Sequence, residues 1–162
     1  MHGGHGGHGD MDTRMVRHHY LMLSVNLLLS LIIMYVAMFA MIWSWGEFVQ
    51  NINFLYMALV MWAPMAAVML LTMRPMYPNK KLNGLLYLAF AAIFILSMIG
   101  IRQQSLVGDR QFLRSMIPHH SGAVLMCEEA KITDPEIRTL CQGIISSQTR
   151  EIDQMKAILE RK

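Results

Sequence analysis

Long apolar stretches alternate with short polar segments over the first two thirds of the chain. The apolar stretches cover residues 20–43, 54–73 and 85–101, and none of them contains Asp, Glu, Lys or Arg. A helix rises ~1.5 Å per residue and a bilayer core is ~30 Å thick, so each stretch can span it, the third only just. The pattern therefore predicts three transmembrane helices, with aromatic residues at their rims: Tyr20, Trp43, Trp45, Tyr77 and Tyr87.

The pattern becomes amphipathic from residue 103 to residue 162, with apolar positions at helical spacing in two stretches. Asp134 can cap the second stretch, and Pro135 suits its first helical position. An antiparallel hairpin folded about Asp134 places Cys127 opposite Cys141. The same register is expected to set His120 opposite Gln148 and Met116 between Glu151 and Met155.

The expected fold is all-α, with three transmembrane helices followed by an extramembrane antiparallel helical hairpin. The expected divisions are a flexible His-rich tail (1–19), a transmembrane region (20–102) and the hairpin (103–162). A hairpin of about 60 residues buries little core alone. We therefore expect homo-oligomerisation, to a dimer or higher, to complete a helical bundle.

Charge refines this picture. Hydrophobic residues make up 54% and charged residues 15% of the chain, and the net charge of +3 comes with no basic patch interleaved with aromatics, so nucleic acid is not an expected partner. Arg14 and Arg17 precede the first span, whereas the loop after it carries only Glu47. The expected location is a bacterial-type inner membrane, and the positive-inside rule predicts a cytoplasmic N-terminus and a periplasmic or extracellular hairpin.

The hairpin concentrates soft metal donors. Thioether sulfur and imidazole suit Cu(I) or Ag(I) better than Mg²⁺ or Ca²⁺. The candidate ligands are Met116, His119, His120, Met126 and Met155. Gln148 and Glu151 are candidates to orient the imidazoles, and Asp109 either does the same or caps its helix. The alternative is that these methionines and histidines only fill a core.

The two cysteines fall in register in a domain expected outside the cytoplasm, which favours a Cys127–Cys141 disulfide. Two buried thiols, or thiols that join the metal site, are the alternatives. Catalysis is not expected, because the chain has no Glu-x-x-His, no Ser-His-Asp arrangement and no Gly-rich phosphate loop. A copper redox enzyme stays open.

Two further groups of donors lie outside the hairpin. Methionines recur every fourth residue in the second span, including Met57, Met61 and Met65, and either pack or act as stepping sites for Cu(I). His2, His5 and His8 form a tail that binds metal weakly or is only solvated.

The segment DRQFLRSMIPHHSGAVLMCEEAK and the later SSQTREIDQMK resemble the domain-of-unknown-function family 305. The matching positions are Asp109, Phe112, Met116, His119, His120, Ala123, Met126, Gln148, Glu151, Ile152 and Met155. The resemblance implies a ferritin-like helical domain, of a kind that in some members binds copper or silver outside the cytoplasm. Many members carry the motif twice and close a four-helix bundle, whereas this chain carries it once.

The function favoured by these residues is membrane-anchored binding of Cu(I), with Ag(I) as a second candidate ion, for metal tolerance or delivery. One alternative is copper transport through an oligomeric Met-lined membrane bundle. Another is a structural or partner-binding membrane protein without a metal function. The expected partners are therefore the lipid bilayer, metal ions and further copies of the chain.

Overall fold

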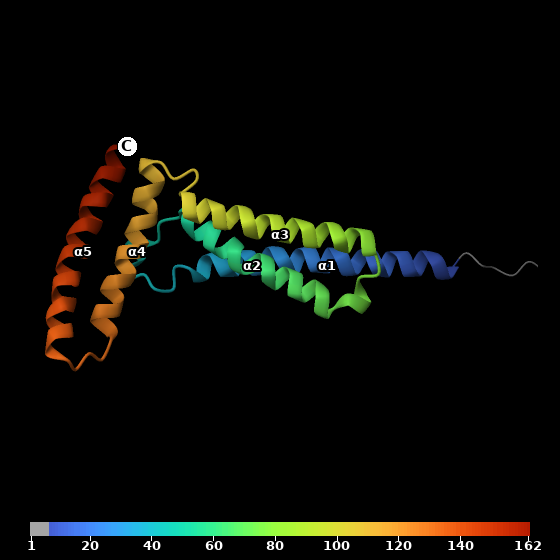
Figure 1. The fold of residues 1–162 in the computed structure, drawn as a ribbon, viewed down its shortest axis with the longest axis horizontal. Coiled ribbons are helices and arrows are strands. Elements are labelled where there is room, and N and C mark those ends of the chain that lie inside the picture. The colour runs from blue at the N-terminus through green and yellow to red at the C-terminus, as the bar shows by residue number, and fades with distance from the viewer. Residues whose placement is uncertain (1–6) are drawn as a thin grey trace, which may run out of the picture. The chain divides into compact units, whose positions relative to one another are not determined.

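The computed structural model describes residues 7–162, with side chains from Arg14 onward, and all regular elements in this part are helical. The elements are α1 (Gly7–Ala37), η1 (Trp45–Glu47), α2 (Ile52–Thr72), η2 (Arg74–Met76), α3 (Lys80–Gln103), α4 (Asp109–Glu129) and α5 (Pro135–Arg161) (Figure 1). The all-α prediction is confirmed. The chain divides into two compact units, unit 1 (residues 1–34 and 58–98) and unit 2 (residues 35–57 and 99–162).

Unit 1 is built from most of α1, α2 and α3 around a core centred on Trp62. The indole packs edge-on against Phe90 and donates a hydrogen bond to the Leu27 carbonyl at 2.7 Å. Ala63 and Ala66 are fully buried, and such small side chains let helices approach closely. All three helices are long and apolar enough to cross a membrane. The three long apolar helices expected from the sequence pattern are therefore present.

The ends of the first span differ from the sequence prediction. α1 begins at Gly7, inside the segment expected as a flexible tail, because a helix already formed extends at little cost. It ends at Ala37 rather than near Trp43, and a series of tight turns follows. His2 and His5 lie outside the described residues, and only the backbone of His8 is described.

Unit 2 contains the expected hairpin. α4 and α5 lie side by side (Figure 1), and the connecting turn ends at Asp134, whose carboxylate accepts from the amides of Glu136 and Ile137. Pro135 occupies the first turn of α5, so the predicted cap is confirmed. Leu113, Ile117, Ile152 and Met155 form the buried cluster between the two helices.

The hairpin does not form unit 2 alone. The segment 35–57, which joins the first two apolar helices, belongs to the same unit. Gly122 of α4 lies against the Met41 carbonyl, where an added Cβ would sit 3.4 Å from the oxygen. The amide of Ile52 donates to the Gln111 side chain at 3.2 Å. The expected hairpin domain therefore packs against a polypeptide segment that precedes it by about half the chain.

Candidate metal site

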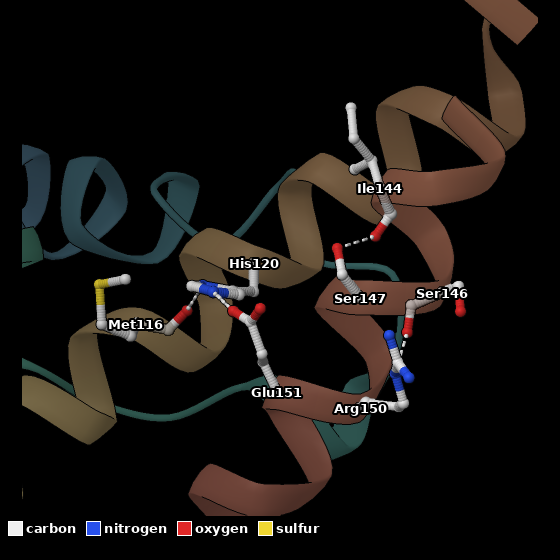
Figure 2. A network of polar contacts seen from close by, with 7 residues as sticks. All are labelled: Met116, His120, Ile144, Ser146, Ser147, Arg150 and Glu151. Atoms are coloured by element: carbon white, nitrogen blue, oxygen red, sulfur yellow. Dashed lines mark hydrogen bonds and ion pairs between the residues drawn. The ribbon is translucent and has the colours of Figure 1, made fainter. Parts of the chain in front are cut away.

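His120 occupies the centre of the expected metal site. It projects from α4 and is buried, with only 7% of its surface exposed. Its Nε2 lies 2.7 Å from Oε2 of Glu151 on α5, and its Nδ1 lies 3.0 Å from the Met116 carbonyl oxygen one turn back (Figure 2). The imidazole thus joins the two helices of the hairpin.

Both partners of His120 are hydrogen-bond acceptors. A carbonyl oxygen offers no proton, so the Met116 carbonyl accepts from Nδ1, and Nε2 is the nitrogen that faces Glu151. A metal ion needs a nitrogen lone pair. Metal binding through Nε2 therefore requires that the Glu151 carboxylate moves away, and that side chain is 50% exposed to solvent.

Two of the five candidate ligands are thioethers inside the hairpin. Met155 is 9% exposed and belongs to the buried cluster, and Met116 packs against the same cluster. The carbonyl of Met116 is also the group that His120 contacts. Met116 and Met155 therefore share one cluster of the hairpin, and His120 lies next to Met116 through the backbone carbonyl of that residue.

The other two candidate ligands face outward. His119 is exposed, and its ring centroid lies 6.1 Å from that of His120. Met126 is 54% exposed and Phe112 is 51% exposed. These three residues are seven positions apart, so they lie along one stripe of α4. Adjacent residues of a helix differ by about 100° in direction, which is why His119 and His120 face different surroundings.

Of the three residues expected to orient the imidazoles, Glu151 contacts His120, whereas Gln148 and Asp109 have other surroundings. Gln148, placed opposite His120 by the sequence register, lies one turn earlier on α5 and is half-buried. The side chain of Asp109 does not cap α4, and its ion-pair partner is a lysine rather than an imidazole. It pairs with Lys162, whose hydrogen bond and charge lower the pKa of the Asp109 carboxyl.

The cysteines meet as the register implies. Cys127 and Cys141 form a disulfide near the turn, with their Cα atoms 5.2 Å apart. Neither thiol is then free to join a metal site.

The first polar loop contributes a buried carboxylate that the sequence pattern did not single out. Glu47 is 7% exposed and accepts from the Ser44 amide at 3.1 Å and from the Ser121 hydroxyl. Lys156 of α5 approaches it at 3.5 Å. Ser121 is fully buried and also accepts from the Trp43 amide at 2.6 Å. This network fixes the loop to both helices of the hairpin. The Ser-x-x-Glu spacing of a capping box is a sequence signal for the contact between Ser44 and Glu47 only.

The donors outside the hairpin have mixed surroundings. In α2, Met57 is 44% exposed and Met61 is 50% exposed, whereas Met65 packs partly against the core of unit 1. The series thus turns around the helix as a four-residue step dictates. Among the side chains that the structure describes, residues 14–162, no three His, Cys, Asp or Glu gather closely enough to hold a metal ion.

These features define an all-α protein with three apolar helices of membrane-spanning length and a disulfide-linked helical hairpin. The family model described as domain of unknown function (DUF305) matches residues 66–159, and the chain belongs to this family. The match begins within α2, so it extends beyond the hairpin that carried the resemblance.

The chain is also similar to uncharacterized protein L153 of Acanthamoeba polyphaga mimivirus. The two are 32% identical over 121 residues, which cover 74% of this chain and 78% of the viral protein. No solved structure matches the chain.

Proposed function

We propose that the protein is anchored in a membrane by α1, α2 and α3 and that its hairpin binds a soft monovalent metal ion, Cu(I) or Ag(I), for metal tolerance or delivery. The observation that supports the proposal is that Met116 and Met155 share the cluster between α4 and α5, while His120 joins the same two helices through Met116 and Glu151. Two thioethers and an imidazole are a donor set that soft ions prefer.

A metal ion bound at Nε2 of His120 would need the lone pair of that nitrogen, so the Glu151 carboxylate would have to move away from it. The Glu151 side chain is 50% exposed, which leaves it room to turn into solvent. In this proposal Glu151 orients the His120 ring before a metal ion binds.

The exposed stripe of α4 supports pairing between two copies of the hairpin. A hairpin that leaves Phe112 and Met126 about half exposed on α4, and Leu140 61% exposed on α5, has apolar surface still to cover. We propose that a second copy of the hairpin covers it, which completes the four-helix arrangement with this single-motif chain. His119 and Met126 would then lie at the contact between copies.

The side of the membrane is part of the same proposal. Arg14 and Arg17 before the first span, with Glu47 as the one charged residue of the loop after it, favour a hairpin outside the cytoplasm. The disulfide suits such an oxidising compartment.

The test is an anaerobic Cu(I) titration of the full-length protein in detergent against a competing chelator. We expect His120→Ala and Met155→Leu each to weaken binding at the hairpin by about tenfold or more. Met98→Leu is the matched control, because Met98 lies in α3 and is 39% exposed. Equal Cu(I) affinity for the wild type and the His120→Ala variant would exclude the hairpin as the site.

A further inference from the structure

A second group of soft donors lies in unit 1, where the beginning of α1 meets the end of α2 and the turn η2. A cavity of 300 Å³ occurs there. The nitrogen and sulfur donors that line it are His18, His19, Met22, Met69, Met73 and Met76. None of these residues belongs to the hairpin, so this site is separate from the one proposed above.

His19 is oriented as a metal ligand. Its Nδ1 lies 3.3 Å from the Met76 carbonyl oxygen, which accepts a hydrogen bond from that nitrogen. A neutral imidazole that donates through Nδ1 carries its lone pair on Nε2. Metal-binding histidines commonly donate their other N–H to a backbone carbonyl in this way. His120 differs, because both of its nitrogens contact acceptors.

The methionines come from two elements that converge on His19. Met69 belongs to α2 and is half-buried, and Met73 follows the end of that helix. Met76 belongs to η2 and is 37% exposed. Next to His19, Tyr20 links α1 to α3, since its hydroxyl donates to the Asn83 side chain at 2.8 Å.

The lining also excludes other ions. The described side chains that line the cavity include no Asp or Glu, so these offer no carboxylate oxygen to hard cations such as Mg²⁺ and Ca²⁺. Tyr77, which also lines the cavity, is 4% exposed. Burial, followed by the neighbouring Tyr20, raises the pKa of Tyr77, so its phenol stays neutral and does not act as an anionic ligand.

We propose that His19, Met69, Met73 and Met76 form a second binding site for a soft monovalent cation, Cu(I) or Ag(I), at this end of unit 1. The site lies at the end of the spans that carries Arg14, Arg17 and Arg74, which the positive-inside rule assigns to the cytoplasm. The protein then has a group of soft donors in each of its two compact units.

The test uses the full-length protein in detergent with methyl-¹³C methionine and Ag(I) as a redox-inert probe. We expect the methyl resonances of Met73 and Met76 to shift as Ag(I) is added up to two equivalents, one for each proposed site, and that of Met98 to stay. This readout needs no substitution. Unshifted Met73 and Met76 resonances in excess Ag(I) would overturn the proposal.

Substitutions provide the second measurement. Met73→Leu with Met76→Leu conserves volume, and we expect it to weaken Ag(I) binding at this site by about tenfold or more. His19→Gln should weaken it more than His18→Gln, because only His19 is oriented by the Met76 carbonyl. Equal effects of the two histidine variants, or none from the double methionine variant, would contradict the assignment.

A third variant distinguishes Ag(I) binding at this cavity from binding at the hairpin. His120→Ala removes the hairpin donor, and the shifts of Met73 and Met76 should remain in it unchanged. Loss of those shifts in His120→Ala would mean that the cavity does not bind on its own, which contradicts the second site. If the wild type shows no hairpin binding but keeps these shifts, the function proposed for the hairpin fails and the second site stands.

Discussion

Removal of one hydroxyl group should loosen the attachment of the first loop to the hairpin. In the wild type, Ser121 is fully buried, donates to the Glu47 carboxylate and accepts from the Trp43 amide. Ser121→Ala deletes both contacts without adding volume. The alanine methyl group offers neither a donor nor an acceptor to the two groups left behind.

The expected loss of stability follows from these two contacts. A hydrogen bond to a charged group contributes about 1.5–3 kcal/mol, and an unsatisfied buried amide costs about 1–3 kcal/mol. Glu47 keeps the Ser44 amide and Lys156, so we take values near the lower ends. The free energy of unfolding should fall by about 3 kcal/mol, which corresponds to a decrease in Tm of roughly 6–12 °C for a chain of this size.

The assay is thermal unfolding in detergent, followed by helical circular dichroism, together with hydrogen exchange of the Trp43 amide. Ser146→Ala is the matched control, because Ser146 is exposed on α5. The control should keep its Tm within about 2 °C of the wild type. A Ser121→Ala variant with the Tm and Trp43 protection of the wild type would refute the network as a source of stability.

Three further predictions concern the hairpin. Cys127→Ser with Cys141→Ser opens a loop with a sequence separation of 14, which should lower the stability of the hairpin by about 3 kcal/mol. A denaturation midpoint unaffected by both the double variant and reductant would contradict this. Asp134→Ala removes the α5 cap and should cost about 1 kcal/mol, and an unchanged Tm would refute the cap. Lys162→Ala should raise the pKa of Asp109, followed by NMR titration of its carboxyl, because the lysine now lowers it. The stability from this pair is present above the ordinary Asp pKa and is lost as pH falls through the lowered one, so an unchanged pKa in the variant would exclude the pairing.

Much of the fold follows from simple patterns in the chain. Uninterrupted apolar runs predicted the three long helices, because only a helix satisfies the backbone of such a run in a membrane. The Asp134–Pro135 pair predicted the start of α5, because a carboxylate cap and a fixed φ act locally. The disulfide partners followed from register, since Cys127 and Cys141 lie close to the turn that sets it.

The details of the candidate site were harder to predict. Register estimated from one turn drifts along a hairpin, so Glu151 rather than the expected Gln148 meets His120. Whether a helix position faces a partner or water also depends on what covers it, and His119 is uncovered in unit 2. The contact of Glu47 with Ser121 joins positions far apart in sequence, and the hydrophobic periodicity around each position does not predict that the two meet.

The composition of unit 2 has a practical consequence for anyone who wishes to study the hairpin by itself. A fragment that starts at residue 103 would discard Trp43, Ser44 and Glu47 and uncover a face of α4 that is normally shielded. Grafting the loop back through a short artificial linker, in circularly permuted order, is the rational way to obtain a well-behaved soluble version.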